Sequence, residues 1–400
     1  MGLKPQRLYG ANNWLESKPH PITFPSLPLY SVMSARKHYD VVILGGGPGG
    51  TSAAITLAQA GVSVAVCERS HYQENRVGEM LSPWIRPLLT ELGQWEGFTQ
   101  AGHLSSPGMI CCWGSSQPYE NEFIFNPYGC GWHINRCNFD QSLALAAKKA
   151  GAIVLLNTLV VEVNYQEGGW NIPIRQGGEL TNLRADFLID ASGRSQLNKG
   201  ILATERIYLD SLMGVAQFFD NTPNSAIDDA RTLIEATEEG WWYSAQLPRG
   251  KAIAVLMTDR DCLPIKRSDF QAYWKKSLLT TPHTRERVNT WHQVDKLHTY
   301  DACTSRQYSF SGQQWLAVGD AAATYDPLSA QGILKAISNG INAARAITES
   351  RVSHVCSFQD YHLSLNTSFA EYTKERKLYY TQERRWTNNI FWQRRQENYK

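Results

Sequence analysis

The sequence predicts an α/β fold in which a Rossmann-like nucleotide-binding part is joined to an antiparallel β-sheet. The first observation behind this prediction is a unit of strand, glycine-rich turn, helix and strand within about 30 residues, between residues 39 and 69. The second is that the stretches 213–220, 231–248 and 251–258 have the residue pattern of strands, the last two joined by a Pro-Arg-Gly turn. The chain has 400 residues, enough for two or three parts of roughly 150 residues each.

The glycine turn has the spacing of a dinucleotide-binding motif. Residues 39–44 form a short β-branched run that predicts a parallel strand buried on both faces. In the turn that follows, Gly45 permits a tight bend, Gly47 lets the backbone approach a pyrophosphate, and Gly50 lets the next helix pack close to the strand. That helix, predicted for 51–61, would present unpaired N–H groups and its positive dipole end to the phosphates.

An acidic residue stands where such a motif needs one. The second strand, predicted for 62–66, ends in Cys67, Glu68 and Arg69. Glu68 lies 21 residues beyond Gly47 (68 − 47), at the place where a carboxylate accepts the ribose hydroxyls of a dinucleotide. The complete unit therefore predicts a nucleotide site and not a glycine turn that binds nothing.

Two later segments favour FAD over NAD as the nucleotide. Residues 187–194 and 315–322 each read as a strand that runs into a small-residue turn, and Asp320 stands at the end of the second strand. An Asp in this place can accept hydrogen bonds from a polyol. The loop 325–332 contains a glycine and leads into a helix predicted for 333–347. Such a loop can aim N–H groups at the pyrimidine edge of a flavin, where negative charge develops on reduction.

Together these motifs resemble those of the FAD-dependent monooxygenase superfamily. The stretch Arg76-Val77-Gly78-Glu79-Met80-Leu81-Ser82-Pro83, and Arg136 followed by Phe139-Asp140, are similar to the tryptophan-halogenase-like branch. The resemblance covers residues 38 to 395. It implies a Rossmann-like FAD-binding domain of the p-hydroxybenzoate-hydroxylase or halogenase type, an antiparallel substrate-domain sheet and a C-terminal helical segment.

The resemblance also implies roles for individual residues. Glu68 would hold the adenosine ribose, Arg136 would lie near the pyrophosphate, and Asp320 would lie at the ribityl or pyrophosphate region. Residues 331–333 would meet the isoalloxazine edge. The FAD-binding residues predicted in this way are Gly45, Gly47, Pro48, Gly49, Gly50, Glu68, Arg69, Arg136, Asp320, Pro327, Gln331, Gly332 and Ile333.

The same reading divides the chain into parts. We expect an N-terminal extension at 1–37 that carries no secretory signal, and a C-terminal helical segment at 348–400. The FAD-binding domain is expected to be discontinuous, and so is the substrate domain. Their expected ranges are 38–100, 130–204 and 300–347 for the first, and 101–129 and 205–299 for the second.

Three departures from the halogenase pattern make halogenation improbable. No Lys follows the Gly78-Glu79 motif at the position that halogenases of this branch use. The loop before Gly332 reads Ser329-Ala330-Gln331, without the Glu of tryptophan halogenases. Their W-x-W-x-I-P motif is also broken, because Tyr243 stands at its second Trp.

What remains is oxygen transfer to an electron-rich aromatic ring, for which reduced flavin activates dioxygen. We expect Glu79, beside the Gly78 turn, to serve as a base, and Trp241 and Tyr243 to serve as an aromatic wall. Consecutive strand residues face opposite ways, so Trp241 and Tyr243 would share one face while Trp242 takes the other. In the alternative interpretation, all three are core residues of the sheet.

The C-terminal segment narrows the resemblance. Residues 379–386 and 391–395 are similar to a non-halogenating subgroup of flavoproteins. Members of this subgroup are required for cysteine tryptophylquinone biogenesis in lysine- and glycine-oxidase-type proteins. The implied partner is a precursor quinoprotein oxidase polypeptide, whose Trp is hydroxylated. From 371 to 400 there are eight basic and four acidic residues (8 − 4 = +4), which would suit a docking role or a solvated helix face.

Two other functions stay open at this stage: a monooxygenase for a small aromatic metabolite, and a flavin-containing maturation chaperone. The reductant is expected to be NAD(P)H or a separate flavin reductase, since no second dinucleotide motif is evident.

The composition argues against several other classes of protein. A net charge of +2, from 39 basic and 37 acidic residues, does not suit a nucleic-acid binder. No apolar run approaches the ~18 residues of a membrane helix, so no membrane partner is expected. The eight cysteines form no C-x-x-C pair, which predicts no metal site and a reduced, cytoplasmic protein.

Overall fold

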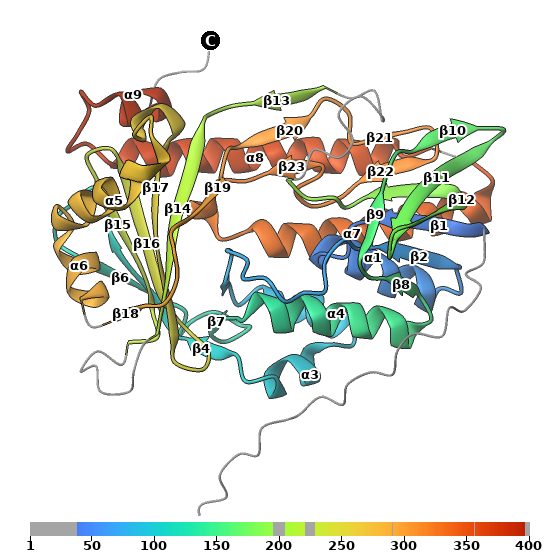
Figure 1. The fold of residues 1–400 in the computed structure, drawn as a ribbon, viewed down its shortest axis with the longest axis horizontal. Helices are drawn as coiled ribbons and strands as arrows, with labels where there is room; N and C mark the ends of the chain where they lie inside the picture. The colour runs from blue at the N-terminus through green and yellow to red at the C-terminus, as the bar shows by residue number, and fades with distance from the viewer. Residues whose placement is uncertain (1–37, 195–204, 221–228, 290, 356, 397–400) are drawn as a thin grey trace, which may run out of the picture. The chain divides into compact units, whose positions relative to one another are not determined.

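The computed structural model describes residues 38–194, 205–220, 229–289, 291–355 and 357–396, and Figure 1 shows their arrangement. The N-terminal extension predicted for 1–37 lies outside the described residues. From residue 37 onward the chain is one compact unit. The division of that unit into an FAD-binding and a substrate domain therefore stays a prediction.

The nucleotide-binding part is built on a nine-stranded mixed sheet whose central strands run in parallel. Strand β1 (His38–Leu44) lies between β12 (Glu179–Asp190) and β2 (Val64–Cys67), and it pairs with both in parallel. Beyond these, β8 (Ile153–Leu155) pairs with β2 and β22 (Trp315–Ala317) pairs with β12, again in parallel. Residues 41–44 are almost completely buried, as the β-branched run predicts. The α/β prediction is confirmed.

Helices cover this sheet and bring their N-termini to one edge of it (Figure 1). Helix α1 (Pro48–Gln59) follows β1 directly, and α4 (Arg136–Ala150) precedes β8. Helix α7 (Gly332–Ser353) crosses α1 closely, because a Cβ on Gly340 would stand only 2.2 Å from the carbonyl oxygen of Gly49. The helices predicted for 51–61 and 333–347 are thus present.

A second, eight-stranded sheet forms the other main part. Its order is β18 (His292–Gln293), β14 (Leu212–Asp220), β17 (Lys251–Asp259), β16 (Gly240–Leu247), β15 (Thr232–Thr237), β5 (Gly108–Cys112) and β6 (Tyr119–Glu122), with β19 (His298–Asp301) also on β14. All neighbours are antiparallel except β15 and β5, which run in parallel. The smaller elements are β3 (Met80–Leu81), β4 (Leu104–Ser106), β7 (Gly131–His133), β9 (Thr158–Val160), β10 (Asn164–Gln166), β11 (Gly169–Gln176), β13 (Arg206–Tyr208), β20 (Ser305–Gln307), β21 (Ser311–Gly312), β23 (Ala323–Thr324), α2 (Ile85–Glu91), α3 (Trp95–Gln100), α5 (Phe270–Leu279) and α6 (Pro282–Val288).

The single strand predicted for 231–248 is in fact two strands. A tight turn at residues 238–239 separates β15 from β16, and the two strands pair with each other. Gly240 makes this turn possible, because a Cβ at that position would lie 2.0 Å from the carbonyl oxygen of Met257 on the neighbouring strand. Because hydrophobic residues lie on both sides of the turn, the sequence pattern does not reveal the interruption.

The alternation predicted along β16 is confirmed. Trp241 and Tyr243 belong to the face that packs under the C-terminal helices, whereas Trp242 packs on the opposite face with Trp274 of α5. The two faces have separate hydrophobic cores, as a sheet covered on both sides requires.

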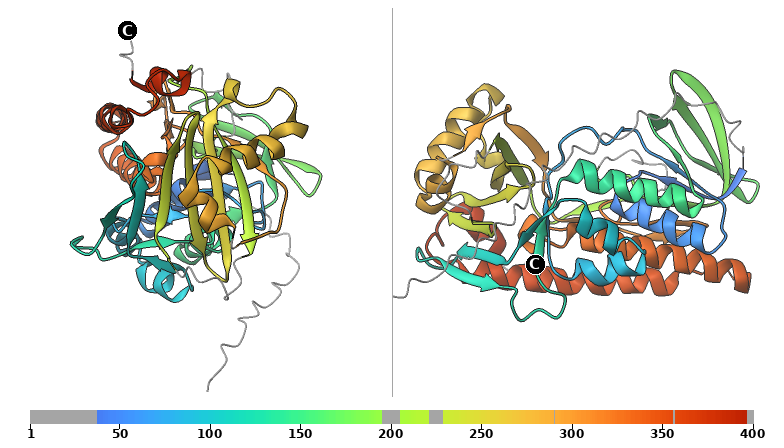
Figure 2. Two further views of the ribbon diagram at one scale, coloured as in Figure 1. Left: turned by 90° about the vertical axis from the view of Figure 1, so that its left-hand side faces the viewer. Right: turned by 90° about the horizontal axis from the view of Figure 1, so that it is seen from below.

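Two C-terminal helices complete the unit. Helix α8 (Gln359–Gln382) runs from the parallel sheet to the antiparallel one, and α9 (Ile390–Gln396) closes over the latter (Figures 1 and 2). Near its start, the Tyr361 hydroxyl of α8 donates to the carbonyl oxygen of Ala317 at 2.7 Å. Near its end, Tyr380 packs against Trp113 of the antiparallel sheet.

The positive charge of this segment serves internal contacts. Arg376, Arg385, Arg394 and Arg395 are all paired with carboxylates of the chain itself. Part of the excess basic charge expected for residues 371–400 therefore helps to hold α8 and α9 in place.

None of the helices in the described part of the chain combines the length and the apolar character needed to cross a bilayer.

Candidate functional site

Among the three motif glycines of the turn after β1, one position is open and two are crowded. A Cβ on Gly45 would lie 2.4 Å from the carbonyl oxygen of Ala191, and one on Gly50 would lie 2.0 Å from that of Gly45. A Cβ on Gly47, the N-cap of α1, would meet nothing within 4 Å. Open space at a helix N-terminus is what a pyrophosphate needs, because the backbone N–H groups there have no partners within the helix. Pro48 and Gly49 are the first two residues of α1.

Glu68 is held at the end of β2. Its Oε2 accepts a hydrogen bond from the backbone N–H of Gly46 at 2.8 Å, and its Oε1 accepts one from the N–H of Ser70 at 2.9 Å. The Arg76 guanidinium lies 3.5 Å from the same carboxylate. These contacts orient Glu68 beside the glycine turn, as expected for a ribose acceptor, while its neighbour Arg69 is exposed.

Arg136, the first residue of α4, is fixed from two sides. It makes a two-pronged ion pair with Asp140 one turn later, at 3.0 and 3.2 Å. It also donates to the carbonyl oxygen of Val77 at 2.9 Å. Asp140 in turn binds Arg76 at 3.1 Å. The 76–83 stretch and the start of α4, which the sequence singled out separately, thus form one cluster beside the nucleotide motif.

Asp320 lies in a cationic cluster that includes a residue missed by the sequence analysis. Its Oδ2 accepts from Nε of Arg194 at 3.1 Å, and its Oδ1 accepts from Nζ of Lys335 at 2.9 Å. Burial alone would raise the pKa of Asp320, but the charges of Lys335 and Arg194 outweigh burial and hold that pKa well below its usual range. Lys335 also donates to the carbonyl oxygen of Ala323. A lysine inside an otherwise apolar helical pattern could have signalled this pair.

The loop at 326–331 joins this cluster to α7. Asp326 caps a short 3-10 turn, accepting from the backbone N–H of Leu328 at 3.0 Å, and Pro327 begins that turn. Ala330 has a left-handed backbone with φ of 50°, which costs a non-glycine residue of the order of 1 kcal/mol. Gln331 is the N-cap of α7, and a Cβ on Gly332 would meet nothing within 4 Å. Ile333 is buried in the hydrophobic core of the nucleotide-binding part.

The chain's own residues therefore fit FAD. The open Gly47 position, the carboxylates of Glu68 and Asp320, and the open N-terminus of α7 lie at the edge where the parallel strands end. Arg136 is paired with Asp140, and Arg194 and Lys335 are both paired with Asp320.

Glu79 is a buried acid with an unused oxygen. Its Oε2 accepts from the N–H of Gly78 at 2.9 Å, but its buried Oε1 has no hydrogen-bond partner among the described residues. Burial raises the pKa of Glu79 to about 7. The hydroxyl of Tyr243 is likewise buried without a partner in the described chain, and burial, reinforced by the Glu79 charge, raises the pKa of Tyr243. Such groups are candidates for contact with a ligand or for proton transfer.

A cavity of about 220 Å³ lies next to the 326–331 loop. Its walls come from β5 and β6 on one side and from α8 on the other, and Leu328, Ser329, Ala330 and Gln331 line one side of it. Its aromatic lining consists of Trp113, Tyr119, Phe123, Tyr372 and Tyr379.

Trp241 is not part of this lining, because it is almost fully buried and its Nε1–H donates to the Tyr380 hydroxyl at 3.1 Å. Its placement is that of a core residue, so the stacking role expected of it is not supported. Tyr243 also lies outside the lining and is only partly buried.

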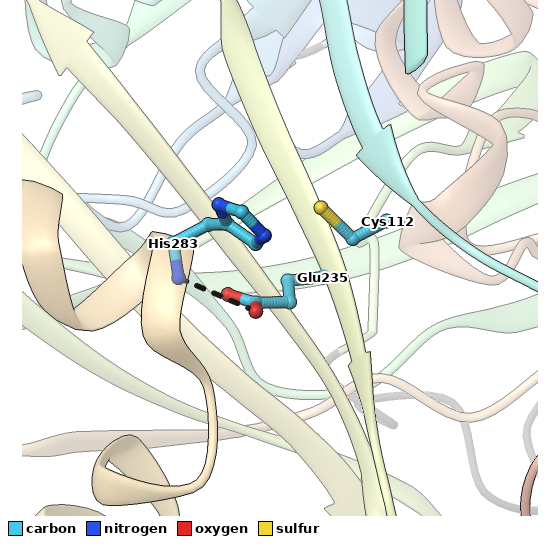
Figure 3. Close-up of side chains that lie close together, drawn as sticks. All are labelled: Cys112, Glu235 and His283. Carbon is cyan, nitrogen blue, oxygen red and sulfur yellow. Dashed lines mark hydrogen bonds between the residues drawn. The ribbon is translucent and has the colours of Figure 1, made fainter. Parts of the chain in front are cut away.

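Cys112, Glu235 and His283 form a cluster of metal-ligand types, with ligand atoms within 4.8 Å of one another (Figure 3). The cluster has a simpler explanation. Glu235 accepts from the backbone N–H and the hydroxyl of Thr284, both at 2.7 Å, and so caps the start of α6. Burial, with a smaller contribution from the Glu235 charge, raises the pKa of the Cys112 thiol to about 12, away from the thiolate that a metal binds.

Residues 38–351 match the family model described as "FAD binding domain", so the chain belongs to this family of flavoproteins. The fold and the comparisons together define a flavin-dependent enzyme of the halogenase-like FAD branch.

Among its relatives is LodB of Marinomonas mediterranea, described as a putative FAD-dependent oxidoreductase. It is 29% identical over 367 residues, which are 89% of this chain and 96% of LodB.

Two solved structures show the same fold. The myxobacterial chondrochloren halogenase CndH superposes with a TM-score of 0.82 at 22% identity, over 91% of this chain and 87% of the other. QhpG, a peptidyl tryptophan dihydroxylase essential for tryptophylquinone cofactor biogenesis, superposes with a TM-score of 0.74 at 23% identity, over 90% and 79%. The predicted FAD-binding fold with its C-terminal helices is confirmed.

Proposed function

We propose that this protein is an FAD-dependent monooxygenase that hydroxylates a Trp side chain of a partner polypeptide during maturation of a tryptophylquinone cofactor. The observation that carries the proposal is the aromatic cavity whose wall is the loop before α7. That loop is the one expected at the isoalloxazine edge, so a ring in the cavity would lie beside the flavin. The likeness to QhpG supports a peptidyl Trp as the ring.

Bound FAD, once reduced, would supply the activation of dioxygen. The chain's own contribution is to hold the ring and to exclude water. Trp113 and Phe123 are partly or fully buried aromatic walls, and ring contacts of this kind are worth ~0.5–1.5 kcal/mol beyond burial. Tyr119 and Tyr379, which are 46% and 56% exposed, stand at the open side, where a polypeptide would enter.

Glu79 does not itself line the cavity but directly precedes Met80, which does, and it is proposed as the group that takes a proton from the ring. A carboxyl group with a pKa of about 7 is half ionised at neutral pH and can both accept and return a proton. Its unpartnered Oε1 is the atom proposed to receive it.

Halogenation is disfavoured. The described residues that line the cavity include no lysine. Lys335, on the flavin side, is bound to Asp320 and to a carbonyl oxygen and is not free to react.

The test is co-expression with a precursor quinoprotein oxidase, followed by peptide mass spectrometry. We expect one or two oxygen atoms to be added to a single Trp of the partner. Met109→Trp, which fills the cavity, should abolish the addition while FAD binding is retained. Leu180→Trp adds the same side chain at an exposed position and is the control.

Efficient oxygenation of free tryptophan, with an unmodified precursor, would favour the small-molecule monooxygenase instead. A precursor that binds tightly without any oxygen uptake would favour the chaperone. A brominated product in the presence of bromide would overturn the exclusion of halogenation.

The partner is proposed to be that precursor polypeptide, in the cytoplasm. Electrons are proposed to come from NAD(P)H or through a separate flavin reductase. Oxygen consumption by the purified protein, measured once with NAD(P)H alone and once with a flavin reductase added, distinguishes the two electron sources.

A further inference from the structure

Three separate sequence motifs meet at the hydroxyl group of Tyr380. The Nε1–H of Trp241, from β16, donates to this hydroxyl at 3.1 Å. The hydroxyl in turn donates to Oδ2 of Asp326, from the loop before α7, at 2.8 Å. All three side chains are almost completely buried. The antiparallel sheet, helix α8 and the loop are thus joined by one chain of hydrogen bonds.

Helix α8 contributes two further contacts to Asp326. Nε of Arg376 donates to its Oδ2 at 3.2 Å, and its backbone N–H donates to the hydroxyl of Tyr372 at 2.6 Å. Its Oδ1 accepts from the N–H of Leu328 at 3.0 Å. One face of the helix therefore fixes both the side chain and the backbone at the start of the loop.

The loop needs such support because it contains an unfavourable conformation. Ala330 is left-handed, four residues after Asp326, and the chain enters α7 two residues later. A left-handed alanine persists only where the surroundings impose it. Asp326, at the start of the loop, has a fully buried side chain that is hydrogen-bonded to α8.

Tyr380 is suited to this task because it stays neutral. It lies between the guanidinium groups of Arg376 and Arg395, whose carbons are 5.1 and 5.3 Å from the centre of its ring. Arg395 is itself bound to Asp259 and Arg376 to Asp210. Burial, together with Asp326, raises the pKa of Tyr380, so the hydroxyl remains a donor to the carboxylate.

We propose that Tyr380 is a positioning residue for FAD, which acts through Asp326 to hold the 326–331 loop in the conformation that receives the flavin. Tyr380 does not line the cavity. The proposal rests on FAD binding by this family and is independent of the identity of the substrate.

The test compares Tyr380→Phe with Tyr273→Phe in the full-length protein, using apoprotein titrated with FAD. Both variants lose a phenol–carboxylate hydrogen bond, because the Tyr273 hydroxyl donates to Glu239 at 2.8 Å on the outer side of the antiparallel sheet. We expect Tyr380→Phe to bind FAD roughly ten-fold more weakly, which is ~1.4 kcal/mol, and to shift the visible flavin spectrum. Tyr273→Phe should lower the thermal midpoint without changing either quantity.

If Tyr380→Phe bound FAD like the wild type, with an unchanged spectrum, the hydroxyl would be merely structural and the proposal would be wrong. Asp326→Asn keeps the size of the side chain but removes the charge that Tyr380 and Arg376 bind, and it provides a second route should the first variant fail to fold. It should weaken FAD binding to a similar degree, and the double variant should be no weaker than either single one. Wild-type affinity in Asp326→Asn, or full additivity in the double variant, would also overturn the proposal.

Discussion

Gly47 and Gly50 lie three residues apart, yet an added side chain would have different consequences at the two positions. The Cβ of a residue at 47 points into open space, whereas at 50 it would overlap the backbone of the preceding turn. The second glycine therefore serves the fold, whereas the first leaves room for the ligand that we expect there.

Gly47→Val should accordingly give a folded protein that does not bind FAD, because the side chain occupies the space of the pyrophosphate. Gly50→Ala should instead unfold at a lower temperature, since its Cβ would stand 2.0 Å from a carbonyl oxygen. Thermal unfolding and the flavin content of each purified variant measure the two effects. A flavin-loaded Gly47→Val protein would contradict the assignment.

Glu79 should make the stability of the flavin-free protein depend on pH. Burial raises the pKa of Glu79 from its ordinary value of 4.5 to about 7. The folded state therefore disfavours the charged form. The resulting decrease in the free energy of unfolding is absent below pH 4.5, grows between pH 4.5 and about 7, and is constant above that range. At 1.36 kcal/mol per pH unit it reaches ~3 kcal/mol.

We expect Glu79→Gln to remove this dependence. The stability difference between the variant and the wild type, measured by denaturant unfolding, should increase in favour of the variant as the pH rises from 4.5 to 7. A difference that does not change over this interval would show that the carboxyl group is not in a low-dielectric site.

At the level of single elements, the short helix α6 depends on a side chain from a neighbouring strand. Helix α6 has only seven residues, and its N-terminus is capped by Glu235 of β15. The cap explains why a buried carboxylate lies beside Cys112 and His283 (Figure 3).

Replacement of Glu235 by Gln should weaken the cap and lower the free energy of unfolding by ~1–2 kcal/mol. Because the cluster is explained without a metal, EDTA should leave the thermal midpoint of the wild type unchanged. A midpoint that falls with EDTA and returns with zinc would instead identify a metal site.

At the scale of the whole molecule, α8 and α9 join the nucleotide-binding sheet to the antiparallel one. Trp113, Tyr380 and Trp392 pack edge to face between the sheet and these helices, with Trp113 5.6 and 5.3 Å from the other two rings.

The flavin should be bound without a covalent link. The residues proposed to bind it, at the glycine turn, at Asp320 and in the 326–331 loop, offer hydrogen bonds and charge, and they include no Cys or His. Denaturation should thus release all the flavin into the supernatant, and yellow colour in the precipitate would contradict this. Added FAD should raise the thermal midpoint in proportion to the logarithm of its concentration.

The sequence by itself determined the nucleotide-binding unit, since each of its requirements is local. A buried strand, a turn that needs glycine and a helix N-terminus lie within a few residues, so backbone sterics alone specify them. The opposite directions of Trp241 and Trp242 followed in the same way from the two-residue repeat of a strand.

The location of the cavity, by contrast, follows only from the tertiary structure. Trp241 bonds to a residue 139 positions away and lies in the core, while the cavity is lined from β5, β6 and α8. The pairing of Lys335 with Asp320, and of Tyr380 with Asp326, likewise depends on how helices pack on sheets. Contacts between residues far apart in the sequence depend on how whole helices and sheets pack together. A local sequence pattern does not specify that packing.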